Sequence, residues 1–394
     1  MKTNLLISPI KSTRERILSS CREFLCGVNS ELENFQIEVT EESLDNEPYR
    51  LVFIGSGGAA KEFRELFNRT NGPYVLLSTQ YNNSLPACME ILSYINDHGE
   101  KGQIVYGTYR EIARKLERLD RIFRANASLS KMTFGVLGSP NVLINSEADP
   151  AVLEKNTGIK TVELSMDEVL DEISKNRYTE NEYTELLMKR ASDRNEMKKS
   201  LYVYGGVKRL QEKYGFNGIA LRCFDLLEPL MASGCIALAI LNAEGIYAAC
   251  EGDTRSLLSM AVLGEISHEP CFMANPSRLD TERSTMLFAH CTLPINMPES
   301  FSLDTHFESD ISIAVRGEFT KGEFTLFKCR ENMKDYFVQK GDFVSCPKEK
   351  LFCRTQLELR IPDWKTYLTK PLSNHQIIAK GNWTEDINEF FSWK

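Results

Sequence analysis

The stretch 49-YRLVFIGSGGAAKEFRELF-67 decides the fold class of the first part of the chain. It starts with a short apolar run, passes through a glycine-rich turn and continues with a helical pattern. A second apolar run follows at 73–80, and a second helical pattern lies at 87–97. Strands that alternate with helices form parallel sheets, so the sequence predicts an α/β domain here.

The same alternation starts again near Met132. Strand-like runs at 132–137, 159–164 and 216–224 are separated by helical patterns, which include a charged helical segment over 180–214. We therefore expect a second doubly wound α/β domain.

The pattern changes after about Glu265. Apolar and polar residues nearly alternate over 311–330, 334–346 and 351–361, and glycine-containing turns lie among them. Such alternation is typical of antiparallel strands with one buried face, in a small barrel or a sandwich. The sequence thus predicts a β-rich, barrel-like third part.

At 394 residues the chain is too long for one ordinary core. The expected domains are an N-terminal α/β domain at 1–130, a second α/β domain at 131–264 and a C-terminal β-rich domain at 265–394.

Composition excludes several classes of function. The net charge is -8 and basic residues are not concentrated anywhere, so the electrostatic signature of nucleic-acid binding is missing. The most apolar uncharged run, 229–243, is 15 residues, too short to span a membrane, and the N-terminus lacks a signal-peptide pattern. Eleven cysteines without a C-x-x-C pair indicate free thiols. We expect a cytoplasmic protein without nucleic-acid or membrane partners.

The segment GSGGAA at 55–60 fits the dinucleotide-binding pattern G-x-G-x-x-A between a strand and a helix. The acidic residue expected at the end of the next strand is absent. A tight strand-to-helix turn is therefore favoured, and a nucleotide-dependent oxidoreductase is the less favoured alternative.

Two carboxylates lie in the stretch ACEGD at 249–253, after the strand-like run GIYAAC. Asp253 is suited to cap an amphipathic helix that starts at Thr254. Glu251 lies where a strand ends, and ligands of open α/β sheets bind at the carboxyl ends of strands. The pattern predicts a local role for Asp253 and makes Glu251 a candidate functional residue.

Histidine is unevenly distributed: of five, only His98 lies in the first 250 residues. Asn275 follows Glu251 by 24 residues, His290 ends an apolar strand, and His375 precedes an apolar run. A carboxylate, an amide oxygen and imidazoles are suitable ligands for a divalent cation such as Mn²⁺. A hydrogen-bonded core position is the alternative for each histidine.

Four short motifs resemble the L-fucose isomerase and L-arabinose isomerase superfamily: ACEGD at 249–253, FMAN at 272–275, AHC at 289–291 and NH at 374–375. The resemblance implies two α/β domains followed by a β-rich domain, and a divalent metal, usually Mn²⁺, in a cleft between domains. It also implies oligomers, so we expect a homo-oligomer that binds a small-molecule sugar.

The resemblance assigns roles to individual residues. It implies that Glu251 binds the metal and transfers protons, that His375 binds the metal, and that His290 is a further ligand. The second proton-transfer role of the reaction then falls to His290, to a metal-bound water or to Asp253, and we take His290 as the catalytic candidate. Asn275 stands where the family has a second acidic ligand; its amide oxygen can coordinate a cation but cannot accept a proton. Asn374 and His306 are the expected sugar contacts, with a surface turn as the alternative for His306.

The implied activity is that of an aldose-ketose isomerase, an intramolecular oxidoreductase that acts on a fucose- or arabinose-type monosaccharide through an enediolate. The alternative, from another class of function, is a sugar-binding protein. In this case the loss of the second acidic ligand has removed turnover or changed the chemistry.

Overall fold

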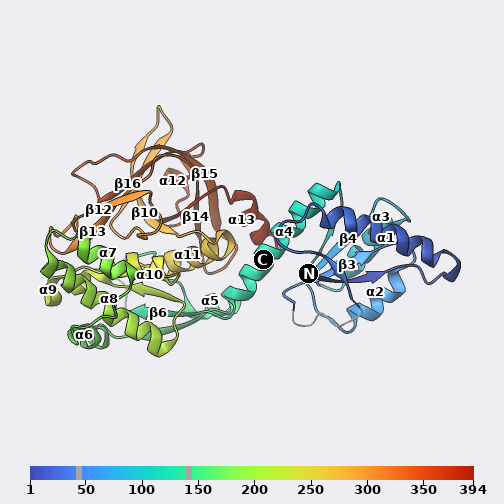
Figure 1. The fold of residues 1–394 in the computed structure, drawn as a ribbon, viewed down its shortest axis with the longest axis horizontal. Helices are drawn as coiled ribbons and strands as arrows, with labels where there is room; N and C mark the ends of the chain where they lie inside the picture. Colours follow the sequence, from blue (N-terminus) through green and yellow to red (C-terminus); the bar gives the residue numbers. More distant parts are fainter. Residues whose placement is uncertain (41–46, 139–143) are drawn as a thin grey trace. The chain divides into compact units, whose positions relative to one another are not determined.

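The computed structural model describes residues 1–40, 47–138 and 144–394 of the chain (Figure 1). By its internal contacts the chain forms two compact units. The first is Met1–Ala127 with Trp393, and the second is Ser128–Ser392 with Lys394. The further division of the second unit into an α/β domain and a β-rich domain stays a prediction.

The first unit contains a parallel sheet of five strands in the order β2-β1-β3-β4-β5, which confirms the predicted α/β fold. Strands β3 and β4 are buried along their whole length, as expected from their mostly apolar sequences, RLVFI and YVLLS. The strands are β1 (Lys2–Leu6), β2 (Glu38–Val39), β3 (Arg50–Ile54), β4 (Tyr74–Ser78) and β5 (Gly102–Val105). The helices are η1 (Lys11–Thr13), α1 (Arg14–Asn29), α2 (Ala60–Phe67), α3 (Ser84–Asp97) and α4 (Tyr109–Leu129).

The glycine-rich segment forms the turn between β3 and α2. The Gly57 amide donates a hydrogen bond of 2.8 Å to the Asn82 carbonyl. A Cβ atom on Gly57 would lie 3.2 Å from the Cβ of Asn83, and Gly58 has a φ of +80°. The glycines therefore let this turn pack closely against the loop after β4, which supports the turn interpretation over a nucleotide site.

The second unit begins with a parallel sheet of four strands in the order β7-β6-β8-β9. The strands are β6 (Thr133–Leu137), β7 (Lys160–Leu164), β8 (Gly218–Leu221) and β9 (Tyr247–Ala249). The helices are α5 (Pro150–Thr157), α6 (Met166–Ser174), α7 (Glu182–Arg190), α8 (Arg194–Tyr214), η2 (Cys223–Leu226), α9 (Leu227–Leu230), α10 (Cys235–Ala243) and α11 (Thr254–Ser267).

The charged segment over 180–214, predicted as one helical segment, forms two helices, α7 and α8. The break has a local cause: the Asp193 side chain accepts hydrogen bonds from the amides of Asn195 and Glu196 and so caps a new helix.

The β-rich part is a closed barrel with the strand order β10-β11-β16-β15-β14-β17, all antiparallel, and β12 and β13 form a separate antiparallel pair. The barrel alternative of the sequence prediction is thereby confirmed. The strands are β10 (Phe272–Asp280), β11 (Thr285–His290), β12 (Ser300–Thr305), β13 (Ile313–Glu318), β14 (Glu323–Cys329), β15 (Tyr336–Ser345), β16 (Thr355–Arg360) and β17 (Gln376–Lys380). The helices are α12 (Lys365–Thr369) and α13 (Thr384–Ser392).

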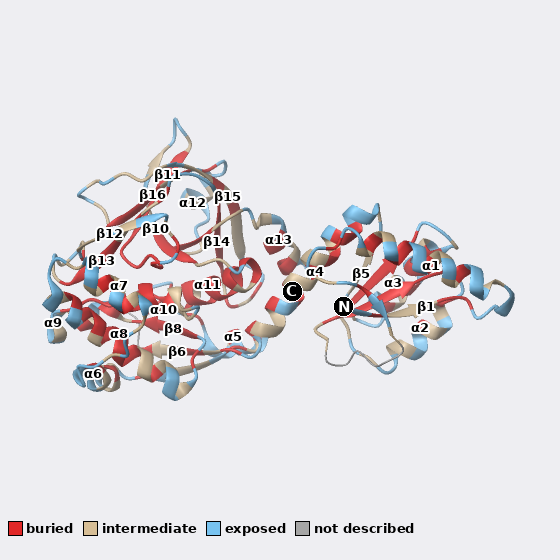
Figure 2. Cartoon of the chain, in the orientation of Figure 1, coloured by how far each residue is buried: buried red, intermediate tan, exposed pale blue. Residues whose placement is uncertain are grey.

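Helix α11 joins the sheet to the barrel (Figure 1). It contacts β8 and β9 of the sheet and β14 and β17 of the barrel. All of its residues except Arg255 and Glu265 are buried (Figure 2). The prediction of an amphipathic helix was wrong, because a helix packed between two layers buries nearly its whole circumference.

No helix in the described ranges is long and apolar enough to cross a membrane.

Candidate metal centre

Glu251 lies in the turn between β9 and α11. It has a φ of +57°, and the next residue, Gly252, has a φ of +66°. The Gly252 amide donates a hydrogen bond of 3.0 Å to the Leu221 carbonyl, which ties the turn to the end of β8. A left-handed conformation costs a residue other than glycine roughly 1–2 kcal/mol. Such strain is found at functional sites as well as in turns, so the conformation of Glu251 is consistent with a functional role.

Three neighbouring barrel strands carry the other predicted ligands. His290 is the last residue of β11, and His375 directly precedes β17. Strand β10 lies between them, with Asn275 opposite Ala289 of β11 and Ala274 opposite Gln376 of β17. The barrel register therefore brings the end of β11, with His290, and the residue before β17, His375, to the level of Asn275 within β10.

Glu251, His290 and His375 form one cluster, in which one ligand atom from each residue lies within 4.8 Å of the other two. The His290 Nε2 is 3.6 Å from Glu251 Oε1, and the His375 Nε2 is 3.5 Å from Glu251 Oε2. Both distances are long for hydrogen bonds. Ligand atoms that surround a metal ion at about 2.1 Å lie roughly 3.0–3.4 Å apart, so the spacing fits a shared ion.

The donor set also fits a metal. One carboxylate oxygen and two imidazole nitrogens suit divalent first-row transition metals, and all three side chains are at least partly withdrawn from solvent. Among the described residues, this is the one group of three or more acidic, histidine or cysteine side chains with such spacing.

The outer nitrogen of each imidazole has its own partner. The His290 Nδ1 lies 3.0 Å from the Thr292 hydroxyl, and the His375 Nδ1 lies 2.8 Å from Asp253 Oδ2. A carboxylate can only accept, so His375 donates from Nδ1. Its Nε2, on the side of Glu251, is then the nitrogen available to a metal once it has lost its proton. The arrangement is that of a carboxylate–histidine pair that orients a metal ligand.

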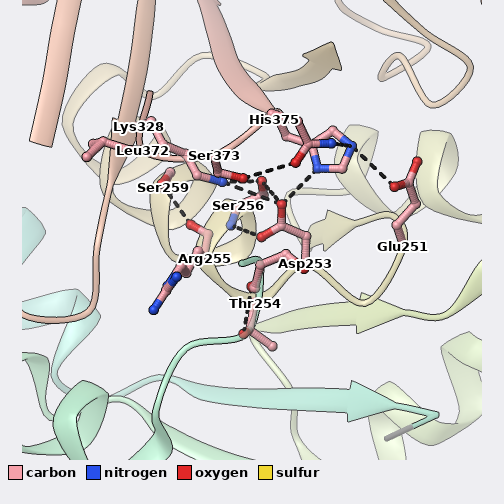
Figure 3. Close-up of polar contacts among 12 residues, drawn as sticks. Glu251, Asp253, Thr254, Arg255, Ser256, Ser259, Lys328, Leu372, Ser373 and His375 are labelled. Carbon is pink, nitrogen blue, oxygen red and sulfur yellow. Dashed lines mark hydrogen bonds and ion pairs between the residues drawn. The ribbon is translucent and has the colours of Figure 1, made fainter. Parts of the chain in front are cut away.

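Asp253 makes further contacts besides the predicted helix cap. Its Oδ1 accepts a 2.7 Å hydrogen bond from the Ser256 amide, which confirms the predicted helix cap. Its Oδ2 also accepts from the Ser256 hydroxyl at 2.7 Å, lies 3.5 Å from Lys328 Nζ and holds His375, 122 residues away in sequence (Figure 3). The interpretation of Asp253 as a purely local residue was therefore wrong.

Burial and neighbouring charges shift the pKa values of Glu251, Asp253 and His375 in opposite directions. Burial raises the pKa of Glu251, but its polar contacts with His290 and His375 and the charge of these imidazoles outweigh burial and hold the pKa well below its usual range. Burial likewise raises the pKa of Asp253, and the Lys328 charge together with His375 lowers it to about 2. The pKa of His375 is lowered by burial and raised more by Asp253 and Glu251, with a net increase. Both carboxylates are ionised at neutral pH.

Asn275 is linked to the cluster through Asn374. The Asn374 Nδ2 donates to Asn275 Oδ1 at 3.2 Å and lies 3.4 Å from the His375 Nε2. The Asn275 amide thus lies one side chain away from His375.

His306 has a different environment. Its Nδ1 lies 2.8 Å from the Ser309 hydroxyl, its ring lies 6.2 Å from the ring of Phe224, and the side chain is buried. It is not a member of the three-residue cluster.

All eleven cysteines are free, as predicted. Cys223, Cys250 and Cys291 are buried next to the candidate site, and the sulfur atoms of Cys223 and Cys250 lie 2.9 Å apart.

Comparison with known proteins gives a weak similarity to sugar isomerases. No protein-family model matches the sequence. A sulfoquinovose isomerase of Alkalicoccus urumqiensis is 22% identical over 189 residues, which are 44% of this chain and 42% of that protein. A sulfoquinovose isomerase of Clostridium sp. (strain MSTE9) is 32% identical over 78 residues, which are 20% of this chain and 17% of that protein. The chain thus spans less than half the length of either relative, and the similarity supports a sugar isomerase-like function.

Proposed function

We propose that the protein is a metal-dependent aldose-ketose isomerase that acts on a monosaccharide or a close derivative. The observation that carries the proposal is the cluster of Glu251, His290 and His375, which come from separate elements and present one carboxylate and two imidazoles to one point. The weak similarity to two sulfoquinovose isomerases supports the same class of reaction.

Moving a carbonyl between C1 and C2 of a sugar needs a base that removes a proton from carbon and a second group that moves a proton between the two oxygens. Glu251 is the proposed base, since its carboxylate is ionised and only partly buried. A bound divalent cation, which we propose to be Mn²⁺, would stabilise the negative charge that develops on the sugar oxygens. Glu251, His290 and His375 would hold it, with Asn275 as a further amide ligand.

The second proton-transfer role goes to His290 in this proposal. Asp253 is fully buried, and its oxygens are bound by Ser256, Lys328 and His375, so it does not reach a substrate. Asn275 cannot take a proton. Proton transfer by a positioned side chain contributes about 10² to 10⁴-fold in rate, so the missing acid predicts a slow enzyme.

Asn374 and His306 are the proposed sugar contacts. Asn374 is the better placed of the two, because its amide lies beside the His375 Nε2. We further propose a homo-oligomer in the cytoplasm, with a fucose- or arabinose-type sugar as substrate.

The second candidate function is sugar binding without turnover. The observation that favours it is Asn275, whose amide oxygen accepts a hydrogen bond from Asn374 where a second carboxylate would serve the reaction.

Exchange of sugar hydrogen with solvent decides between the two candidates. The Mn²⁺-loaded protein is incubated in D₂O with a panel of aldoses that includes fucose, arabinose and sulfoquinovose, and NMR follows deuterium at C2 and the appearance of ketose. The isomerase proposal predicts exchange for at least one sugar and its loss in Glu251→Gln.

The matched control is Glu265→Gln, at the other end of α11, where the carboxylate accepts a hydrogen bond from Tyr247. This variant should retain exchange. Binding of a sugar without exchange would contradict the isomerase and support the binding protein.

A further inference from the structure

Lys328 is a cation enclosed within the second unit. Its side chain is 1% exposed and lies on β14 between Phe327 and Cys329. The Nζ atom donates a hydrogen bond of 2.6 Å to the Ser256 hydroxyl and lies 3.5 Å from Asp253 Oδ2. Phe327 pairs with Ile377 of β17, so Lys328 lies beside the strand that His375 precedes.

Stability alone is a weak reason for a lysine at this position. Lys328 and Asp253 are both withdrawn from water, with side-chain exposures of 1% and 0%. The cost of removing two charges from water largely cancels their attraction, and well-packed apolar side chains of similar size are often as stabilising. The pair is therefore expected to contribute to the orientation of neighbouring side chains.

The geometry concerns the carboxylate of Asp253 (Figure 3). Its Oδ1 is held by the Ser256 amide, and its Oδ2 receives the Ser256 hydroxyl and faces Lys328. These donors fix the rotation of the carboxylate, and Oδ2 then has one further direction, toward the His375 Nδ1 at 2.8 Å. A carboxylate fixed in this way holds the ring with Nε2 toward Glu251.

We infer that Lys328 is a positioning residue of the candidate metal centre, which together with Ser256 fixes the Asp253 carboxylate that orients His375. The inference rests on the proposed function, in which His375 binds a cation. Lys328 contacts neither the cation nor the sugar in this account and acts only through Asp253.

Metal titration tests the inference. Wild type, Lys328→Met and Lys340→Met are titrated with Mn²⁺ by calorimetry and with Co²⁺ by visible absorption, after thermal unfolding has shown that each is folded. Lys340 of β15 is the matched control, since it pairs with Glu323 and Asp342 at the surface. Lys328→Met should bind about tenfold more weakly with an altered Co²⁺ spectrum, a loss typical of substitutions at residues that orient a metal ligand. Lys340→Met should match wild type.

A double-variant cycle separates positioning from general damage. If Lys328 acts through Asp253, then Lys328→Met should weaken binding in the wild-type background and should have no further effect in the Asp253→Asn background. Wild-type affinity in Lys328→Met, or the same loss in both backgrounds, overturns the inference. Should Lys328→Met fail to fold, Ser256→Ala, which removes the hydroxyl between Lys328 and Asp253, replaces it with the same expectations.

A second readout does not depend on metal. The chain has five histidines, so ¹⁵N-histidine NMR with His375→Ala as the assignment control resolves the tautomer of His375. At a pH where the His375 ring is neutral, wild type should show Nδ1–H, and Lys328→Met should show a mixture of tautomers. If wild type binds no cation, the proposed function fails, and this spectrum alone decides the inference: an unchanged Nδ1–H tautomer in Lys328→Met overturns it.

Discussion

Replacement of Asp253 by asparagine should reverse the hydrogen bond that orients His375. Asp253 Oδ1 accepts the Ser256 amide at 2.7 Å, so the asparagine must keep its oxygen there. Its NH₂ group then takes the place of Oδ2, 2.8 Å from the His375 Nδ1. An NH₂ group donates, so Nδ1 becomes the acceptor and the hydrogen moves to Nε2. The lone pair that faces Glu251 is lost.

The size of the effect follows from the bond that is exchanged. A hydrogen bond to a charged group contributes about 1.5–3 kcal/mol. Substitution of a residue that orients a ligand typically weakens metal binding by 10 to 100-fold, which corresponds to roughly 1.4–2.7 kcal/mol. We therefore expect Asp253→Asn to bind Mn²⁺ about 10 to 100-fold more weakly than wild type.

Calorimetric titration with Mn²⁺ measures the affinity, and thermal unfolding shows that the variant is folded. Asp193→Asn is the control, because Asp193 caps α8 through the Asn195 and Glu196 amides, and asparagine caps a helix as well as aspartate. This control should bind like wild type. Wild-type affinity in folded Asp253→Asn would refute the orienting role of the carboxylate.

Asn275→Asp adds a second carboxylate beside the cluster and should increase Mn²⁺ affinity and isomerase turnover by about tenfold or more. Calorimetric titration measures the affinity and a ketose assay measures the turnover. Unchanged values of both would exclude Asn275 from the site. Glu251→Gly removes the side chain from a residue with a φ of +57°, so it should raise the free energy of unfolding in urea by about 1 kcal/mol while metal binding is lost. A large decrease in the free energy of unfolding would contradict the inference that the Glu251 backbone is strained. The pKa of Asp253, about 2 against an ordinary 3.8, stabilises the fold above pH 4, and this stabilisation, on the order of 2 kcal/mol, disappears as the pH falls from about 4 toward 2. The difference in unfolding free energy between wild type and Asp253→Asn should therefore shrink from pH 6 to pH 3, and a constant difference would argue against the depressed pKa.

Local patterns were sufficient for most of the fold. The alternation of apolar runs and helices predicted both parallel sheets, and the alternation within 323–329 and 336–345 predicted barrel strands. Helix α11 was misjudged because its own sequence does not reveal that the sheet and the barrel cover it from two sides. That information lies in long-range packing.

The candidate site was only partly predictable. Glu251, His290 and His375 were identified through short motifs, and the structure brings them together. The contact of Asp253 with His375 joins residues 122 positions apart, and no local pattern indicates it. The sequence pattern around Lys328 gives one indication of its role: a charged residue lies between Phe327 and Cys329, near the end of a buried strand. Such a lysine needs a buried partner, but the sequence does not say which one.

Metal content after Mn²⁺ loading and desalting tests directly whether Glu251 and His375 hold a metal ion. Wild type, Glu251→Gln and His375→Ala are analysed side by side by elemental analysis, with Glu265→Gln as the control for the glutamate change. We expect one bound ion per chain in wild type and control, and none in the two site variants. Equal metal in all four proteins, or no metal in wild type, would contradict it.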